Sequence, residues 1–469
     1  MEIPILSGIY TDAGPDLRTA YPVNLIPVPK SSGLSNAYLR PADGLVSYGT
    51  GPGIDRGGIN WNGSLYRVMG TKLVEVASNG TVTILGDVGG PTSQLVDFDY
   101  SFTQLAIASG NRLYYWDGAT LTQVTDPDLG SILPTVIWID GRFMVTDGSS
   151  LIVTDVTNPL AVDPFEYGSS EVDPDPVVSL LKLRNEAYAL NRYTVEVFAG
   201  VDQEGFPFNR IAGAQIQKGT VGTFANCVFQ DQIAMVGSGR NEAVGIYLAA
   251  NGTTQKISTQ EIDLLLLNYS EAQLAQVKVE ARNDRAHAHL YVHLPDQTIV
   301  FDAQASQEVG AMIWFVLTSS IAGFAQYRAR NIVWCYDRWN VGDPQSTTIG
   351  EMVDTIGSHW GQTVRWEFST IIVYNQGFGA IFHQMELVSL TGRVAVGLNP
   401  QISTSYSKDG LTWSQDRFTS VGTVGATLKR IAWFQMGNMR NWRIQRFRGD
   451  SQAHISIARL EAQIEALAA

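Results

Sequence analysis

Three histidines lie close together in the segment HAHLYVH, where His287, His289 and His293 occupy positions of like parity. In an extended strand, side chains alternate between the two faces, so all three imidazoles are expected on one side. Imidazoles grouped in this way can hold a transition metal. The alternative is a polar strand face that meets solvent or a channel. The nearby sequence offers no obvious further ligand, and we therefore predict no metal site.

Other motifs with catalytic potential are incomplete. The loop Gly49–Gly53 is glycine-rich, but Pro52 lies within it and no helical pattern follows, so it is interpreted as a turn and not a phosphate loop. Ser238 lies between two glycines without the spacing of a nucleophile elbow. Ser407–Trp413 resembles the Asp-box hairpin of sialidases but occurs once and is one residue short. We predict no catalytic residues, no cofactor and no enzymatic activity.

A basic segment interleaved with aromatic residues lies near the C-terminus. Its members are Lys429, Arg430, Arg440, Arg443, Arg446 and Arg448, together with Trp433 and Trp442. Such a pattern can bind an acidic protein surface or a nucleic acid, and it also occurs on an exposed strand where arginine stacks on tryptophan. The sequence leaves a partner interface, an ordinary surface and nucleic-acid binding all open.

Composition narrows the class of protein. The 469 residues are 45% hydrophobic and 16% charged, which is typical of a globular chain with a large core. The net charge of -13 argues against general affinity for DNA or anionic membranes. The chain has no run of eighteen apolar residues and its first residues lack a basic signal-peptide region, so we expect no membrane insertion.

Short apolar segments separated by turn residues recur along most of the chain. The stretch 57–88 contains four such segments, with Asn62-Gly63 and Asn79-Gly80 each fitting a two-residue hairpin turn. Four antiparallel strands in about thirty residues is the size of one propeller blade. Comparable units begin near residues 95, 135, 177, 224, 287 and 331. The pattern predicts an all-β chain with a β-propeller of six or seven blades.

The length and spacing of the apolar segments divide the chain into three parts. Residues 1–40 are proline-rich with little periodicity and are expected to form an extended N-terminal arm. Residues 41–356 are assigned to the propeller, with a short helical insertion near 259–281. Longer segments over 357–469 indicate a C-terminal antiparallel β-sandwich with a terminal tail, whose last residues fit either a helix or a strand.

Scattered matches, kept in order, carry a family resemblance. They include Tyr21–Leu25, Gly33–Gly44, Lys218–Thr223, His293–Pro295 followed by Val300–Ala303, and a run from Ser405 to Leu460. In these stretches the chain resembles the packaged-DNA stabilisation proteins, the tail-hub proteins of short-tailed phages. The matches extend over nearly the whole chain, and their order is more telling than any one of them.

The resemblance implies a structural virion protein. Proteins of this family form a homo-hexameric ring beneath the portal and its head-to-tail adaptor, extend the channel, help retain packaged DNA, and provide attachment for a needle or plug, tailspikes or fibres. By resemblance the chain would be assembled in the host bacterial cytoplasm, lie in the virion tail, and let double-stranded DNA pass without specific binding. The alternative from another class is a carbohydrate-binding or sialidase-like propeller, which repeated Asp-boxes would favour.

Overall fold

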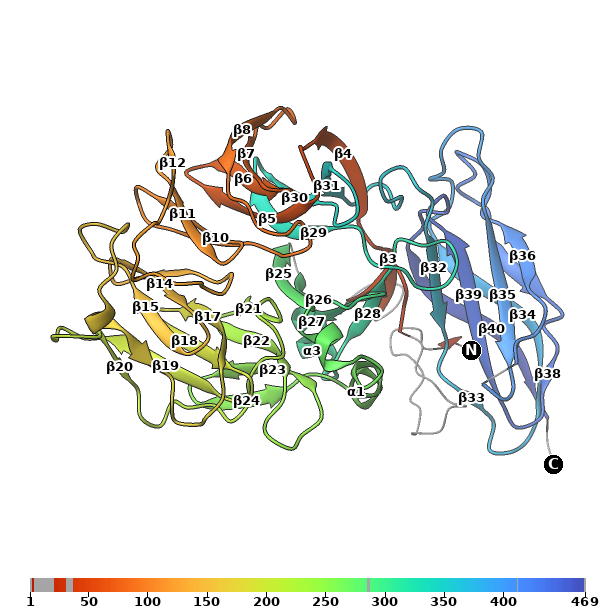
Figure 1. Ribbon diagram of the computed structural model, residues 1–469. Coiled ribbons are helices and arrows are strands. Elements are labelled where there is room, and N and C mark those ends of the chain that lie inside the picture. The colour runs from red at the N-terminus through yellow and green to blue at the C-terminus, as the bar shows by residue number, and fades with distance from the viewer. Residues whose placement is uncertain (1, 4–20, 31–36, 285–286, 411, 468–469) are drawn as a thin grey trace.

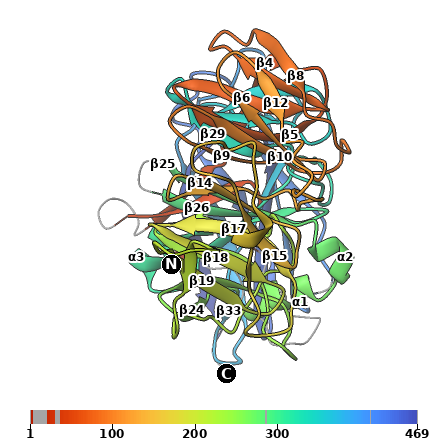
Figure 2. The same ribbon diagram turned by 60° about the vertical axis from the view of Figure 1, so that its left-hand side comes forward.

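The computed structural model describes residues 2–3, 21–30, 37–284, 287–410 and 412–467. Figure 1 shows a ring of small sheets at the left and two larger sheets at the right, and in Figure 2 the ring lies in front of the larger sheets. Among the described residues, no helix is both long enough and apolar enough to cross a membrane. The chain is all-β, with a β-propeller followed by a β-sandwich, which confirms the predicted fold class.

Within the described residues, the propeller has seven blades. Seven four-stranded antiparallel sheets follow one another, and the first strand of each lies beside the first strand of the next until the seventh meets the first. Seven separate hydrophobic clusters each fill the gap between two neighbouring blades. A single blade cannot bury both of its faces, and stacking in a closed ring buries them all. The prediction of six or seven blades is thereby narrowed to seven.

Blade 1 contains β5 (Asp55–Trp61), β6 (Ser64–Met69), β7 (Lys72–Val76) and β8 (Val82–Asp87). Blade 2 contains β9 (Asp97–Tyr100), β10 (Leu105–Ser109), β11 (Arg112–Trp116) and β12 (Leu121–Gln123). Blade 3 contains β13 (Ile137–Ile139), β14 (Arg142–Thr146), β15 (Ser150–Val153) and β16 (Gly168–Ser169), with the 3₁₀ turn η1 (Pro164–Glu166). Blade 4 contains β17 (Val177–Leu183), β18 (Glu186–Asn191), β19 (Val195–Gly200) and β20 (Phe208–Arg210). Blade 5 contains β21 (Asn226–Phe229), β22 (Gln232–Gly237), β23 (Gly245–Ala250) and β24 (Thr253–Lys256). Blade 6 contains β25 (Lys278–Asp284), β26 (His287–His293), β27 (Thr298–Asp302) and β28 (Trp314–Leu317).

Blade 7 closes the ring with a strand from the other end of the propeller. It consists of β29 (Arg330–Cys335), β30 (Arg338–Gly342), β31 (Thr348–Val353) and β4 (Gly44–Thr50). β4 precedes blade 1 in sequence yet pairs antiparallel with β31, with Gly44 opposite Val353 and Thr50 opposite Thr348. This pairing covers the outer edge of β31, which would otherwise expose unpaired backbone groups.

Two-residue hairpin turns account for several of the predicted reversals. Asn62-Gly63, Gly110-Asn111, Asp140-Gly141 and Asn251-Gly252 all have positive φ at both residues and connect directly paired strands. Asn and Gly adopt this conformation at the lowest cost, which explains why these dipeptides mark the turns. The prediction for Asn79-Gly80 was wrong: Val76 pairs with Val82, so the dipeptide belongs to a longer loop in which only Gly80 has positive φ.

Helices are short. α1 (Gln260–Leu266) and α2 (Glu271–Leu274) form the predicted insertion, and Ser270 closes a capping box with Gln273 at the start of α2. The helical stretch ends earlier than predicted, because residues from Lys278 onward already belong to β25. A third helix, α3 (Ala303–Val309), was not predicted; it begins after Asp302, whose side chain accepts a hydrogen bond from the Ala305 N–H.

The sandwich contains two sheets packed face to face. One has β2 (Leu25–Pro29), β3 (Ala37–Pro41), β40 (Ile457–Ala466), β34 (Ala380–Ser389) and β37 (Ile431–Phe434), with β1 (Glu2–Ile3) on β40 and β38 (Asn438–Met439) on β34. The other has β32 (Arg365–Ser369), β39 (Trp442–Asp450), β35 (Gln401–Ser407) and β36 (Arg417–Ser420), with β33 (Val373–Tyr374) on β39. Leu25, Phe382, Phe447 and Leu460 belong to the core between the sheets.

The two ends of the chain correct the sequence-based division. Residues 25–29 and 37–41, predicted as part of an extended arm, form β2 and β3 of the sandwich. Residues 457–466, predicted as part of a tail, form β40, which lies between β3 and β34. The β3–β40 pairing places Leu39 opposite Ile457, more than four hundred residues along the chain, so no local pattern reveals it. The remaining positions of the predicted arm, 1, 4–20 and 31–36, lie outside the described residues.

Candidate functional site

The predicted histidine face exists, but its members serve two separate groups. In β26 the side chains of His287 and His289 point toward Asp302 on β27, whereas His293 lies at the other end of the strand. His293 Nδ1 is 3.0 Å from Thr298 Oγ1, and its Nε2 is 2.9 Å from Glu280 Oε1. Sequence reasoning missed Asp302 because its proximity depends on the β26–β27 register, which places it opposite His289.

The basic segment near the C-terminus does not form one surface. Arg443 is fully buried, with its guanidinium 4.4 Å from the ring centre of Phe382 and 4.0 Å from that of Tyr406. Arg446 stacks on Trp413 at 3.9 Å on the opposite face of β39. Alternation along β39 therefore splits the arginines between the core and the outer face.

The remaining members of that segment also differ in their environments. Trp433 belongs to the core, and Arg448 pairs with Asp416. Arg430 is exposed and pairs with Glu386 on β34, whose side chain is partly buried. Lys429 and Arg440 are exposed as well. The side chains left for a partner are thus a scattered basic fringe of the sandwich.

Charge is divided unequally between the two parts of the molecule. Residues 358–469 contain 11 Lys and Arg against 7 Asp and Glu, a net charge of +4, and the whole chain carries -13. Residues 1–357 therefore carry -17. Part of this charge lies at the outer edge of blade 3, where Asp155, Asp163 and Glu171 are exposed. Figure 1 places blade 3 at the end of the molecule opposite the sandwich.

A continuous seam joins the propeller to the sandwich. Val23 forms a parallel bridge with Val316 of β28 and an antiparallel bridge with Glu367 of β32. Next to it, Asn24 Nδ2 donates to the carbonyl oxygens of Thr318 at 2.9 Å and Arg365 at 2.7 Å. Asn24 Oδ1 accepts from the Thr318 N–H at 3.0 Å. One buried amide therefore satisfies backbone groups of both domains, which ties them rigidly together.

An ion-pair bridge reinforces the seam. Asp43 lies between β3 and β4, where the chain passes from the sandwich to the propeller, and both it and Arg282 of β25 are buried. Asp43 Oδ2 is 2.7 Å from Arg282 Nη1, and its Oδ1 is 3.0 Å from Arg40 Nη1 on β3. Burial raises the pKa of Asp43, but the two guanidinium groups outweigh it and lower that pKa to about 2.

A third polar contact fastens the ring itself. Arg67 of β6 and Asp55 of β5 are both fully buried, with Arg67 Nη1 2.8 Å from Asp55 Oδ1. Asn331 of blade 7 donates to Asp55 Oδ2, and its carbonyl accepts from Arg67 Nη2 at 2.9 Å. The pair thus lies where blade 7 meets blade 1. We refer to the Val23–Asn24 seam together with the Asp43 bridge as the joint, and to Asp55, Arg67 and Asn331 as the ring latch.

The remaining sequence candidates have structural roles. Gly51, which directly follows β4, donates its N–H to the Thr347 carbonyl, and the chain then continues into β5 without forming a helix. In the Asp-box-like turn, Asp409 Oδ1 accepts from the Thr412 N–H at 2.8 Å and lies 2.9 Å from Ser407 Oγ, which fixes the turn.

The joint connects the propeller to the sandwich and the ring latch connects blade 7 to blade 1, an arrangement that suits a structural scaffold. The chain belongs to the family described as bacteriophage P22 Gp10: the β-propeller description matches residues 1–357, and the β-sandwich description matches residues 365–465. The tail hub protein gp10 of Salmonella phage P22 is 24% identical over 460 residues, which cover 94% of each chain. These matches confirm the resemblance to phage tail hub proteins and support a structural, non-enzymatic role for the chain.

Solved structures resemble the chain more distantly. The N-terminal domain of Nup159 has a TM-score of 0.42 and 8% identity over 72% of this chain and 99% of its own. PorZ of Porphyromonas gingivalis has a TM-score of 0.38 and 12% identity over 81% of this chain and 46% of its own. Neither likeness supports an inference about function.

Proposed function

We propose that six copies of this chain form a ring at the base of a phage portal, below its head-to-tail adaptor. The ring extends the channel through which double-stranded DNA passes, helps retain the packaged genome, and provides attachment for a needle or plug, tailspikes or fibres. It is assembled in the host bacterial cytoplasm and becomes part of the virion tail. The observation that carries the proposal is the match to a tail hub protein along both domains in the same order.

The charge division supports a head-to-tail contact between neighbouring copies. A ring needs two different surfaces on each subunit that complement one another. The acidic edge of blade 3 and the basic fringe of the sandwich lie at opposite ends of the subunit, and the strongly apolar Phe165, 88% exposed, accompanies the acidic edge. Opposite charges steer association and fix its register, while an exposed aromatic side chain supplies contact area.

The acidic propeller also supports passage of DNA without specific binding. Each phosphate neutralised by a lysine or arginine adds affinity through counterion release, so a basic wall would hold the genome. Residues 1–357, with a net charge of -17, favour a wall that repels phosphate. A reconstructed tail whose lumen is lined continuously by Lys and Arg would contradict this part of the proposal.

The test of the proposal is assembly on a template. Mass photometry of the isolated chain should give a species near 51.2 kDa, because the propeller and the sandwich each bury their own core. Addition of the cognate portal–adaptor complex should add six copies. A stable hexamer of the isolated chain would refute the dependence on a template, and a different number of added copies would refute the hexamer.

Charge reversal tests the head-to-tail contact separately. The double variant Lys429→Glu/Arg440→Glu should reduce the number of copies bound to the template, and the loss should be largest at low salt, where exposed charges are least screened. Arg112→Glu is the matched control, since Arg112 is an exposed arginine on blade 2. Equal assembly of both variants would remove the basic fringe from the interface.

A further inference from the structure

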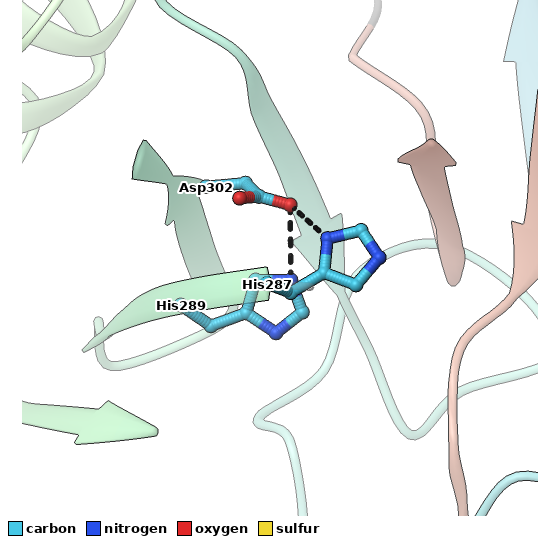
Figure 3. A group of neighbouring side chains, drawn as sticks. All are labelled: His287, His289 and Asp302. Atoms are coloured by element: carbon cyan, nitrogen blue, oxygen red, sulfur yellow. Dashed lines mark hydrogen bonds and ion pairs between the residues drawn. The ribbon is translucent and has the colours of Figure 1, made fainter. Parts of the chain in front are cut away.

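His287, His289 and Asp302 converge between two neighbouring strands of blade 6. His287 and His289 lie two positions apart on β26, so they share a face, and the register places Asp302 of β27 directly opposite His289. Asp302 Oδ2 is 2.5 Å from His287 Nδ1 and 3.3 Å from His289 Nε2. Figure 3 shows both imidazole rings reaching the same carboxylate oxygen.

The surroundings hold these side chains in place. Asp302 is fully buried, and its second oxygen, Oδ1, accepts the Ala305 N–H at 3.0 Å at the start of α3. The two imidazole rings are stacked with centroids 5.1 Å apart. Both His289 and Asp302 are buried, while His287 retains 10% side-chain exposure at the beginning of β26. The group is therefore preorganised on strands, and its exposure is largely that of His287.

We propose that His287, His289 and Asp302 form a binding site for a divalent first-row transition metal ion, of which Zn²⁺ is the probe. Two imidazoles and one carboxylate are a ligand set that suits such ions, and a water molecule completes the fourth position on the solvent side, beside His287. The potential ligand atoms of the three residues all lie within 4.8 Å of one another.

The spacing fits a tetrahedral ion with one adjustment. Ligand atoms about 2.0 Å from a tetrahedral ion lie about 3.3 Å from each other. The 3.3 Å between His289 Nε2 and Asp302 Oδ2 already matches that edge. The 2.5 Å contact of His287 must lengthen, and His287 is the ligand with room to move because it is the least buried of the three.

The proposed metal site lies close to the joint between the propeller and the sandwich. Asp302 caps the N-terminus of α3, and α3 packs against β2, the strand that follows directly after the Val23–Asn24 seam. An ion bound by Asp302 would therefore fasten blade 6 next to the joint. Stabilisation by a bound ion follows from mass action, since the unfolded chain does not preassemble the three ligands.

The experiment uses the full-length chain stripped with a chelator. Isothermal titration with Zn²⁺ should give one equivalent per chain, and Co²⁺ should give visible absorption bands of a tetrahedral site. His287→Ala should weaken Zn²⁺ binding at least tenfold without loss of the fold, as checked by circular dichroism, because His287 lies at a partly exposed strand end. His383→Ala is the control: it removes an exposed sandwich histidine that pairs with Glu465.

Each outcome decides between a metal site and a purely hydrogen-bonded group. One equivalent in the wild type and in His383→Ala, together with weakened binding in His287→Ala, supports the site. Absence of Zn²⁺ binding to the wild type overturns it, as does equal binding by the wild type and His287→Ala. A second variant, Asp302→Asn, should abolish the Co²⁺ bands while leaving a hydrogen-bond acceptor for the Ala305 N–H.

Discussion

The propeller and the sandwich use the same antiparallel strands but assemble them differently. Six of the seven blades are built from four strands consecutive in sequence, so each forms through local hairpins. The sandwich instead joins β1, β2 and β3 from one end of the chain to β40 and β34 from the other. Local pairing costs little loop entropy and leaves a readable sequence pattern, whereas distant pairing costs more and leaves none.

The propeller and the sandwich should also differ in how strongly the loss of one distant strand destabilises them. The propeller has one nonlocal closure, the pairing of β4 with β31, and the ring latch beside it. One sheet of the sandwich depends on strands from both ends of the chain, whereas the other uses strands between residues 365 and 450 alone. Loss of a distant strand should therefore unfold the sandwich while the propeller remains folded.

Deletion of residues 457–469 should prevent the sandwich from folding. It removes β40 from between β3 and β34 and takes Ile457 and Leu460 out of the core. Calorimetry should show loss of one transition with the propeller transition retained, and limited proteolysis should release a propeller fragment. A chain that lacks only residues 467–469 is the control. Survival of both transitions in the longer deletion would show that the sandwich does not depend on β40.

Asp55→Ala should destabilise the propeller by about 3–5 kcal/mol, because it leaves the buried guanidinium of Arg67 without its ion-pair partner. The measurement is chemical denaturation followed by tryptophan fluorescence. Asp87→Ala on the same blade is the matched control: Asp87 pairs with Lys72 at the exposed surface, where an ion pair contributes about 0–1 kcal/mol. Equal losses of unfolding free energy in the two variants would mean that the ring latch stabilises the propeller no more than an exposed ion pair does.

Acid should weaken the joint through Asp43. Its folded pKa of about 2 lies below the ordinary unfolded value of about 3.9, so its stabilisation is present above pH 4 and is lost as the pH falls toward 2. The difference corresponds to about 2–3 kcal/mol. Asp43→Asn should therefore be less stable than the wild type at pH 7 and show a flatter pH dependence between 4 and 2. The exposed Asp128 provides the control as Asp128→Asn, which should keep the wild-type slope.

Asn24→Gly should cost about 1–3 kcal/mol, since it removes three hydrogen bonds from the seam. Asn24 has φ 51°, and glycine retains that conformation without steric cost, so the substitution isolates the amide contacts. Calorimetry should show the two domain transitions moving apart. Asn24→Ala should be destabilised further by about 1 kcal/mol. If the transitions stay coincident in both variants, the seam is not what couples the domains.

The candidate surfaces were only partly predictable. The period-2 pattern of HAHLYVH placed the three histidines on one face correctly, yet Asp302 entered the group only through the strand register. The basic segment looked like one surface in the sequence, but alternation along β39 sends Arg443 into the core and Arg446 outward. Side-chain periodicity gives the face of a residue, and it does not give the neighbour that faces it.

The sequence by itself determined the all-β class, the blade rhythm and most of the hairpin turns. These features depend on residues next to one another, such as Asn62 and Gly63, whose tolerance for positive φ is a local property. The tertiary structure alone decided that β4 closes the seventh blade, that β40 pairs with β3 and β34, and that Asn24 and Asp43 connect the two domains. An alternating strand pairs equally well with many partners, so the choice among distant strands is made by the packing of the whole chain.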